Sequence, residues 1–268
     1  MLISIVILSF NSERTLADCL TKALAALSHY EQPSEILVVE NGSTDGSKEI
    51  LNQFAQKHPS IIKPIIFDEN TGTTKSRNAA LSHCEGEYIV VLDSDAYIEA
   101  PALTTMMEKL DEDLSLGMVC PQLSYGDGRF QISTDDFPTL FRKAQRFLSL
   151  GKMQENVNVN ALKEEDVDYA ISACWMLPRR SILPVGGFDE NIFYSPEDVD
   201  YCIMLWESGF RIRYLPQAHV IHDAQELSRG FKLSFFHFSH LAGLFYLFKK
   251  HGYFFTPNRL RNRLRKSL

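Results

Sequence analysis

Short apolar runs alternate with amphipathic segments in the first half of this chain, and this alternation constrains its fold most. Five runs have the length and composition of buried strands, at residues 2–9, 36–40, 61–67, 88–92 and 117–120. Between them, residues 16–27 and 101–110 carry apolar side chains at helical spacing. The alternation predicts an α/β fold, a single Rossmann-like domain with a mostly parallel central sheet.

Polar side chains stand where three of these runs end. They are Ser9 and Asn11 after the first run, Glu40 and Asn41 after the second, and Asp93, Ser94 and Asp95 after the fourth. Ligands of parallel α/β sheets bind at the carboxyl ends of the strands, so we expect one shared site. Asp93 and Asp95 suit a divalent cation and a sugar hydroxyl, because such cations prefer carboxylate oxygens. Two acids separated by one residue are also typical of a solvated turn, and the motif alone leaves this interpretation open.

A second acidic cluster opens a predicted helix further along the chain. It consists of Glu197, Asp198 and Asp200. We expect Ser195 to cap this helix and Gly209 to end it. Acids in a first helical turn interact favourably with the helix macrodipole, which is a purely structural interpretation. Clustered carboxylates also repel one another, which raises a pKa and favours a proton acceptor. The sequence leaves both interpretations open.

Other features of the sequence indicate where loops and strands lie and in which compartment the protein works. Residues 124–166 are polar and predict a variable loop region, and residues 167–177 predict a strand. The apolar first ten residues lack a preceding basic segment, which indicates a buried first strand rather than a signal peptide. The five cysteines are scattered, which favours free core thiols in a reducing, cytoplasmic compartment.

The last 42 residues differ in charge from the rest of the chain. They contain nine Lys or Arg and no acid, whereas the preceding 226 residues contain 18 basic and 34 acidic side chains. The strongly acidic first 226 residues do not favour nucleic acid as a partner. The apolar stretch at 231–248 is shorter than the ~20 residues that span a bilayer. We expect this basic, amphipathic extension, residues 227–268, to lie on an anionic membrane surface; the alternative is a packed helix with a solvated basic tail.

Eight short motifs occur in an order and spacing that resemble the inverting nucleotide-sugar transferases of glycosyltransferase family 2. In sequence order they start at Ser9, Val39, Asn70, Gly86, Asp93, Gly187, Glu197 and Pro216. The resemblance covers residues 3–223 and implies the A-type glycosyltransferase fold. It also implies a catalytic domain over residues 1–226, with residues 1–95 as the nucleotide-binding half and residues 96–226 as the acceptor-binding half.

The same resemblance implies roles for individual residues. The nucleotide-sugar donor, a UDP- or dTDP-sugar, would contact Ser9, Asn11, Glu40, Asn41, Gly72, Lys75, Arg77, Asp93 and Ser94. Glu40 stands where the family usually has aspartate, which leaves the preferred nucleotide open. Asp95 and His222 would hold Mn²⁺ or Mg²⁺, which neutralises charge on the departing diphosphate.

Asp198 would be the catalytic base, and Glu197 would orient the acceptor or the base. The acceptor would be a hydroxyl of a glycan or of a lipid-linked glycan in surface polysaccharide biosynthesis, on the cytoplasmic face of the membrane. A catalytically silent nucleotide-sugar binder or assembly protein of the same fold stays open. A metal-dependent phosphatase is disfavoured. Its nucleophilic aspartate would be expected after an early strand and before a Thr or Val, whereas Asp95 is followed by Ala96 and Tyr97.

Overall fold

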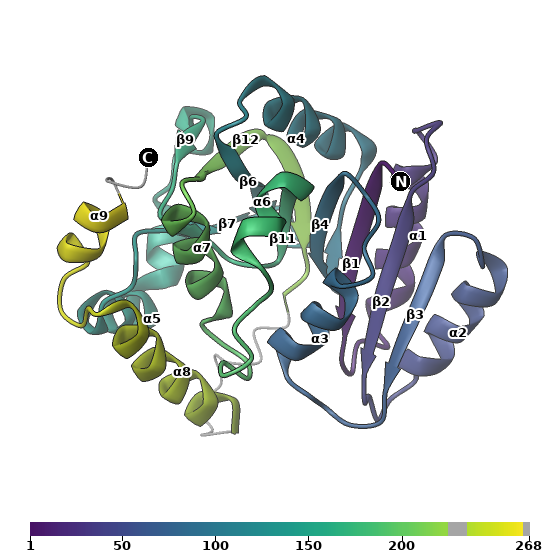
Figure 1. The fold of residues 1–268 in the computed structure, drawn as a ribbon, viewed down its shortest axis with the longest axis horizontal. Coiled ribbons are helices and arrows are strands. Elements are labelled where there is room, and N and C mark those ends of the chain that lie inside the picture. Colours follow the sequence, from purple (N-terminus) through teal and green to yellow (C-terminus); the bar gives the residue numbers. More distant parts are fainter. Residues whose placement is uncertain (225–234, 265–268) are drawn as a thin grey trace.

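The computed structural model describes residues 1–224 and 235–264 of the chain, and its centre is one mixed sheet (Figure 1). The strands in their spatial order are β3 (Ile62–Phe67), β2 (Glu35–Asn41), β1 (Ile3–Ser9), β4 (Tyr88–Asp93), β11 (Cys174–Pro178), β6 (Leu116–Ser124), β12 (Arg211–His222) and β5 (Ala96–Tyr97). The first four are parallel to one another, β11 is antiparallel to both neighbours, and β12 is parallel to β6. The predicted α/β fold with a mostly parallel sheet is confirmed.

Short strands extend this sheet and form a second, two-stranded one. β7 (Phe130–Gln131) pairs with β6, and β9 (Glu165–Asp166) pairs with β12. β8 (Thr134–Asp135) and β10 (Tyr169–Ala170) pair with each other. All five cysteines are buried and free.

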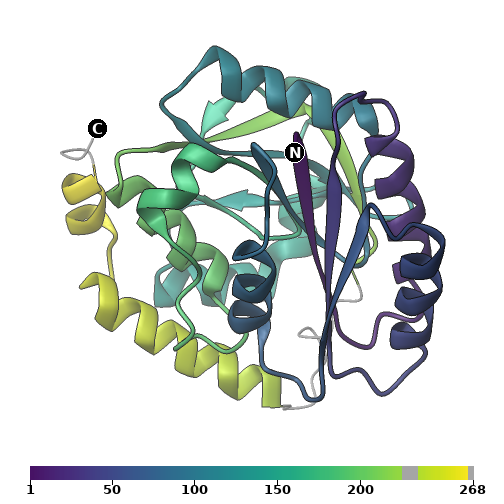
Figure 2. The same cartoon turned by 45° about the vertical axis from the view of Figure 1, so that its right-hand side comes forward.

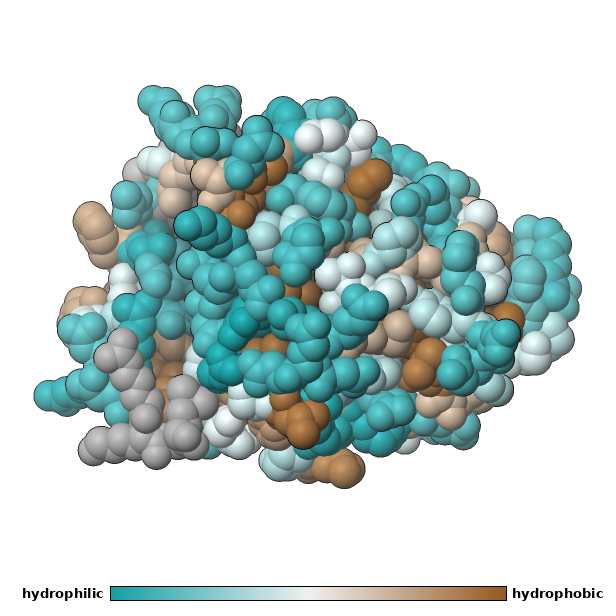
Figure 3. Space-filling model, turned by 90° about the horizontal axis from the view of Figure 1, so that it is seen from above, coloured by the Kyte–Doolittle hydropathy of each residue, from teal (hydrophilic) through white to brown (hydrophobic). Residues whose placement is uncertain are grey.

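Helices cover both faces of the sheet, as Figure 2 shows from a second direction. One core contains α1 (Leu16–Leu27), α2 (Ser47–Lys57) and α4 (Ala100–Glu112), packed on alternate strand residues such as Ile3, Ile5 and Ile7. The opposite face packs against α3 (Thr73–Leu81), α6 (Arg179–Val185) and α7 (Glu197–Glu207). This division follows from the alternation of side chains along a strand. Figure 3 shows the molecule from above relative to Figure 1, and the surface on this side is mainly hydrophilic with small separate apolar patches.

Three local predictions are wrong. The expected loop region at 124–166 contains α5 (Leu140–Glu155) and the short helix η1 (Val159–Ala161). The expected single strand at 167–177 is interrupted between β10 and β11, where the Ile171 N–H donates to Ser133 O. Ser195 does not cap α7; the residue before the helix is Pro196, and the Ser195 hydroxyl instead bonds to His240 Nδ1. The second and third differences depend on contacts distant in sequence, which local patterns do not reveal.

The C-terminal extension packs against the body through α8 (Phe235–His251) and α9 (Asn258–Leu264). Leu244, Leu247 and Phe248 of α8 are buried in the same apolar core as α7. Close packing at Gly243 is required, because a Cβ there would lie 2.1 Å from Ser195 O. No helix in the described ranges 1–224 and 235–264 is long and apolar enough to cross a membrane. The predicted boundary at residue 226 falls outside the described residues.

Basic residues of this extension pair with acids of the body. Lys250 Nζ lies 2.7 Å from Asp189 Oδ2 and 2.8 Å from Asp200 Oδ2. His251 Nε2 lies 2.7 Å from Asp200 Oδ1, and both of these side chains are buried. Burial lowers the pKa of His251, but the two nearby carboxylates raise it by more. Part of the positive charge of the extension is therefore paired with acids of the body and helps to pack the two together.

We predict that Leu247→Ala and Leu241→Ala will differ sharply in stability, although both lie on α8. Leu247 is fully buried, so its truncation should lower the free energy of unfolding by about 2–5 kcal/mol. Leu241 is 50% exposed, so its truncation should change that free energy by less than about 0.5 kcal/mol. Chemical denaturation of the two variants checks this, and equal small effects would show that α8 does not pack as described.

Candidate active site

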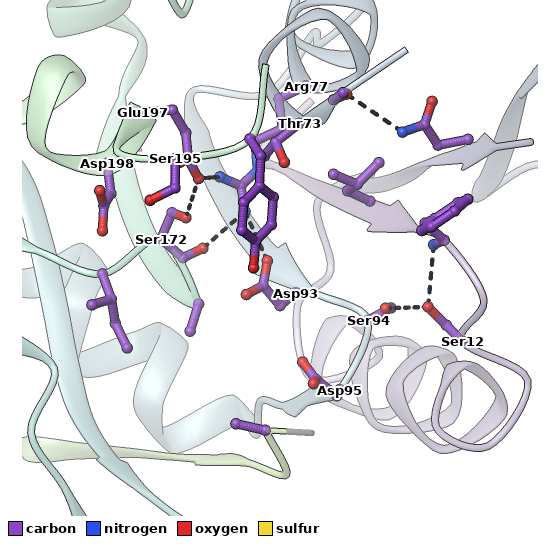
Figure 4. A pocket seen from close by; sticks show the side chains of 18 of the residues that line it. Ser12, Thr73, Arg77, Asp93, Ser94, Asp95, Ser172, Ser195, Glu197 and Asp198 are labelled. Carbon is purple, nitrogen blue, oxygen red and sulfur yellow. Dashed lines mark hydrogen bonds and ion pairs between the residues drawn. The ribbon is translucent and has the colours of Figure 1, made fainter. Parts of the chain in front are cut away.

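A cavity of about 420 Å³ opens at the carboxyl ends of β1, β2 and β4 and continues to the start of α7. Residues far apart in the sequence line it, from Leu8 at the end of β1 to Ala224 just after β12. Figure 4 labels several of them, from Ser12 to Asp198. Ten predicted site residues line this cavity: Asn11, Asn41, Gly72, Arg77, Asp93, Ser94, Asp95, Glu197, Asp198 and His222. The structure therefore brings both acidic clusters into one cavity.

Three predicted donor-binding residues do not line the cavity. Ser9 is fully buried and shares the strand face of Ile7, so it points toward the α1 and α4 side of the sheet. Glu40 is also buried, and its Oε1 accepts a 2.7 Å hydrogen bond from the Ser43 N–H. Lys75 is an exposed residue of α3. These three side chains therefore lie outside the lining of the cavity.

Asp93, Asp95 and His222 form a cluster with the chemistry of a metal site. One ligand atom of each lies within 4.8 Å of the others, and His222 Nε2 is 3.3 Å from Asp95 Oδ1. The pairing of β12 with β5 places His222 directly opposite Ala96, beside Asp95. Burial lowers the pKa of His222, but the hydrogen bond and charge of Asp95 raise it by more. The prediction named Asp95 and His222 as ligands, and the geometry adds Asp93.

Gln131 fixes the orientation of the His222 ring. Its Oε1 lies 2.9 Å from His222 Nδ1, and both side chains are buried. An amide oxygen only accepts, so Nδ1 carries a proton, and Nε2 is the ring nitrogen that faces the two aspartates. Gln131 belongs to the two-residue strand β7, within the region predicted to be loop. No sequence signal identified it.

Arg77 joins the two acidic clusters. Arg77 is 2% exposed; its Nη2 lies 2.7 Å from Asp93 Oδ1, and its Nη1 lies 3.0 Å from Glu197 Oε1. Nη2 also donates to the Ser172 carbonyl oxygen, and the Ser172 hydroxyl lies 3.0 Å from the same Glu197 oxygen. The positive charge of Arg77 is thus shared between two carboxylates. Ser172, like Gln131, was missed because it lies at the unpredicted break between β10 and β11.

Glu197 and Asp198 differ in their surroundings although they are adjacent. Glu197 is buried against Arg77 and Ser172, and burial, reinforced by the charge of Asp198, raises its pKa to about 7. Both carboxylates line the cavity, and Figure 4 shows them at the start of α7 beside Ser172. A carboxylate that already bonds to Arg77 is suited to positioning, which leaves Asp198 as the candidate proton acceptor.

The raised pKa of Glu197 predicts a pH-dependent stability. Between pH 4.5, its ordinary pKa, and about pH 7, folded Glu197 holds a proton that the unfolded chain releases. Its contribution to the free energy of unfolding is therefore full below pH 4.5 and is lost as the pH rises through about 7.

Glu197→Gln removes this titration, so the stability advantage of the unmodified protein over the variant should shrink across that pH range. Denaturant titrations of both proteins at several pH values measure the difference. A constant difference between the two proteins at every pH would contradict the prediction.

Comparison with known proteins places this geometry in context. The chain is 26% identical to the N-acetylglucosaminyl-diphospho-decaprenol L-rhamnosyltransferase of Mycobacterium tuberculosis, over 93% of this chain and 86% of the relative. Among solved structures, S. aureus TarS 1-349 in complex with UDP matches 82% of this chain with a TM-score of 0.60 and 22% identity. The mannosyltransferase PcManGT from Pyrobaculum calidifontis, in complex with GDP-Man and Mn²⁺, matches 85% with a TM-score of 0.59 and 17% identity.

The chain spans 60% and 58% of the lengths of these two solved structures, and at such identities the likeness shows the fold. That fold is the A-type glycosyltransferase fold, as predicted. The family resemblance seen in the motifs is also confirmed. Residues 4–182, more than half of the chain, match Glycosyl transferase family 2, and the chain belongs to this family of glycosyltransferases.

Proposed function

We propose that the chain is a metal-dependent, inverting transferase that moves a sugar from a nucleoside diphosphate to a hydroxyl of a glycan or lipid-linked acceptor. One observation carries the proposal: the cluster of Asp93, Asp95 and His222 and the carboxylate of Asp198 line the same cavity. A transferase needs both a partner for the departing diphosphate and a proton acceptor for the attacking hydroxyl. The relative from M. tuberculosis, named for a diphospho-decaprenol acceptor and an L-rhamnosyl group, is consistent with surface polysaccharide biosynthesis.

The charges around the cavity favour a metal ion at the diphosphate. The cavity is lined by Asp93, Asp95, Glu197 and Asp198, while Arg77 is its one described Lys or Arg and is already paired with two of these acids. A diphosphate therefore meets net negative charge in this cavity. Two carboxylates and an imidazole nitrogen suit Mn²⁺ or Mg²⁺, and Asp93, Asp95 and His222 would hold the ion. When bound, the ion supplies positive charge that stabilises the departing diphosphate.

Asp198 takes the role of general base. Its carboxylate accepts the proton of the acceptor hydroxyl while that oxygen forms a bond to the anomeric carbon. The bond from the same carbon to the diphosphate oxygen breaks on the opposite side, so the configuration inverts. Glu197, held by Arg77 and Ser172, positions the first turn of α7 and with it Asp198.

We predict that Asp198→Asn will lower the rate of sugar transfer by about 10²–10⁴-fold, the contribution of a general base. Donor affinity should be nearly unchanged, since the amide keeps the size of the side chain and the Asp93, Asp95 and His222 cluster is intact. A transfer assay and calorimetric titration with nucleoside diphosphates and Mn²⁺ measure the two quantities.

Matched variants separate the possible outcomes. Glu207→Gln, at the other end of α7, should keep full transfer. Asp95→Asn should lose the Mn²⁺-dependent part of donor affinity. Full turnover by Asp198→Asn would remove Asp198 as the base, and absence of transfer by the unmodified protein with any donor would favour the silent nucleotide-sugar binder.

The C-terminal helices supply an apolar surface next to the acceptor side of the cavity. His240 on α8 bonds to Ser195, which lines the cavity. On the outer side of this extension Leu241 and Phe245 are about half exposed, and Phe255 is 84% exposed. An amphipathic helix with such a face binds at a membrane interface. A peripheral site on the cytoplasmic face of the membrane would bring a lipid-linked acceptor to Asp198.

Replacement of both Leu241 and Phe245 by serine tests this membrane surface. We predict a several-fold loss of the fraction that co-sediments with anionic vesicles, because the two side chains form the exposed stripe of α8. Leu183→Ser is the control, since Leu183 is 78% exposed but lies on α6. Recovery of the unmodified protein entirely in the supernatant would contradict membrane binding.

A further inference from the structure

The segment that leads into the first turn of α7 forms one wall of the cavity. The residues of this segment that line the cavity are Phe193, Tyr194, Ser195, Glu197 and Asp198. Figure 4 shows Ser195 on the same side of the cavity as the two acids of α7. From Pro196 to Asp200, every residue is buried except Asp198, which is half-buried. The position of the Asp198 carboxylate in the cavity therefore depends on how the backbone of this segment is held.

Helix α8 contacts Ser195 twice from one face. His240 Nδ1 lies 2.8 Å from Ser195 Oγ, which is a hydrogen-bond distance. One turn later, a Cβ on Gly243 would lie 2.1 Å from Ser195 O and 3.0 Å from Pro196 Cδ, so the helix backbone packs directly on the cavity wall. Residues three apart share one face of a helix, so the hydroxyl and the carbonyl group of Ser195 meet the same face of α8. These two contacts fix both the position and the orientation of Ser195.

The last turn of α8 holds the other end of the same acidic turn. His251 Nε2 lies 2.7 Å from Asp200 Oδ1, and Lys250 Nζ lies 2.8 Å from Asp200 Oδ2. Asp200 is 1% exposed, and a buried charge that loses its partners is strongly destabilising. Helix α8 therefore holds the chain both before Asp198 and after it.

The opposite side of this wall is held by α3. The Thr73 N–H donates to Phe193 O at 2.7 Å, and the Thr74 hydroxyl donates to Ile192 O at 2.7 Å. Helix α3 lies within residues 4–182, which match the family, whereas α8 lies outside that range. The contacts of α8 with the cavity wall thus come from a part of the chain that the family match does not cover.

We infer that His240 and Gly243 of α8 are positioning residues for sugar transfer. They hold Ser195, and through it the first turn of α7, where the Asp198 carboxylate must meet the acceptor hydroxyl. The inference rests on the proposed function, because it assumes that Asp198 is the base. A base must lie within hydrogen-bond reach of the proton it removes, and a displacement of about 1 Å can lower a rate about a hundredfold. The C-terminal extension is therefore part of the catalytic unit, whether or not its outer face binds a membrane.

The variants His240→Ala and His240→Asn separate positioning from packing. Alanine removes the hydrogen bond to Ser195, so we expect kcat to fall about 10–100-fold. Donor affinity should be unchanged, because the three residues of the candidate metal site are intact. An asparagine amide carries both a donor and an acceptor close to the position of Nδ1, so His240→Asn should recover most of the lost rate.

Two further variants complete the set. Gly243→Ala should lower kcat at least as far as His240→Ala, because its Cβ has no room beside Ser195 O. Lys249→Ala is the matched control, since Lys249 is an exposed residue of the same helix, and it should keep the kcat of the unmodified protein.

Transfer rates and calorimetric titrations of the full chain measure these effects. N-acetylglucosaminyl-diphospho-decaprenol serves as the acceptor, with UDP-GlcNAc, GDP-mannose and dTDP-L-rhamnose as donors in the presence of Mn²⁺. Titration with UDP, GDP and dTDP gives the nucleotide affinity of each variant, and denaturant unfolding gives its stability.

The outcomes distinguish this inference from the proposed function. An unchanged kcat in His240→Ala and Gly243→Ala would overturn the inference and leave the proposed transferase intact. A joint loss of kcat, nucleotide affinity and stability in His240→Ala, without recovery in His240→Asn, would show a purely structural role and overturn it as well. If the unmodified protein transfers no sugar with any donor, the proposed function fails, and the inference fails with it.

Discussion

The buried guanidinium of Arg77 is the interaction on which the rest of the site depends. It lies between Asp93, at the end of a central strand, and Glu197, in the first turn of α7. A buried charge that loses its partner is strongly destabilising, so neither carboxylate can move away without cost to the other. Lysine could not replace it, because a single ammonium group lacks the planar fork that contacts both acids at once. The two acidic clusters are therefore held at a fixed separation.

The opposite charges of the body and the C-terminal extension form ion pairs between the two. Lys250, His251 and Arg261 of the extension contact Asp189, Asp200 and Asp168 of the body, respectively. These cations stabilise the packing of α8 and α9 and are not free for an anionic lipid. The apolar side chains on the outer face are then the stronger argument for membrane binding. Such binding would depend less on salt than binding through a basic patch.

The sequence could predict those features of the fold and site that are local. Strand ends are marked by a change from apolar to polar residues, which is why Asp93, Asp95 and Asn41 were placed correctly at the cavity. The alternation of side chains along a strand could have excluded Ser9, because it lies on the same strand face as Ile5 and Ile7, which are buried in the core. Gln131 and Ser172 could not be found. Gln131 lies in the two-residue strand β7 and Ser172 follows the two-residue strand β10, and strands this short leave no periodic pattern in the sequence.

The two ends of the cavity present opposite chemistry, and a nucleoside diphosphate matches both. At the acidic end, Asp93, Asp95 and the two acids of α7 line the cavity, and Arg77 there is already paired with two of these carboxylates. At the other end, Asn11 and Asn70 offer hydrogen-bond donors and no charge. A free phosphate would satisfy only the first end, and a neutral nucleoside only the second. The carboxylates at one end and the neutral polar side chains at the other fit the proposed donor, a nucleoside diphosphate sugar whose diphosphate would be bound through a cation.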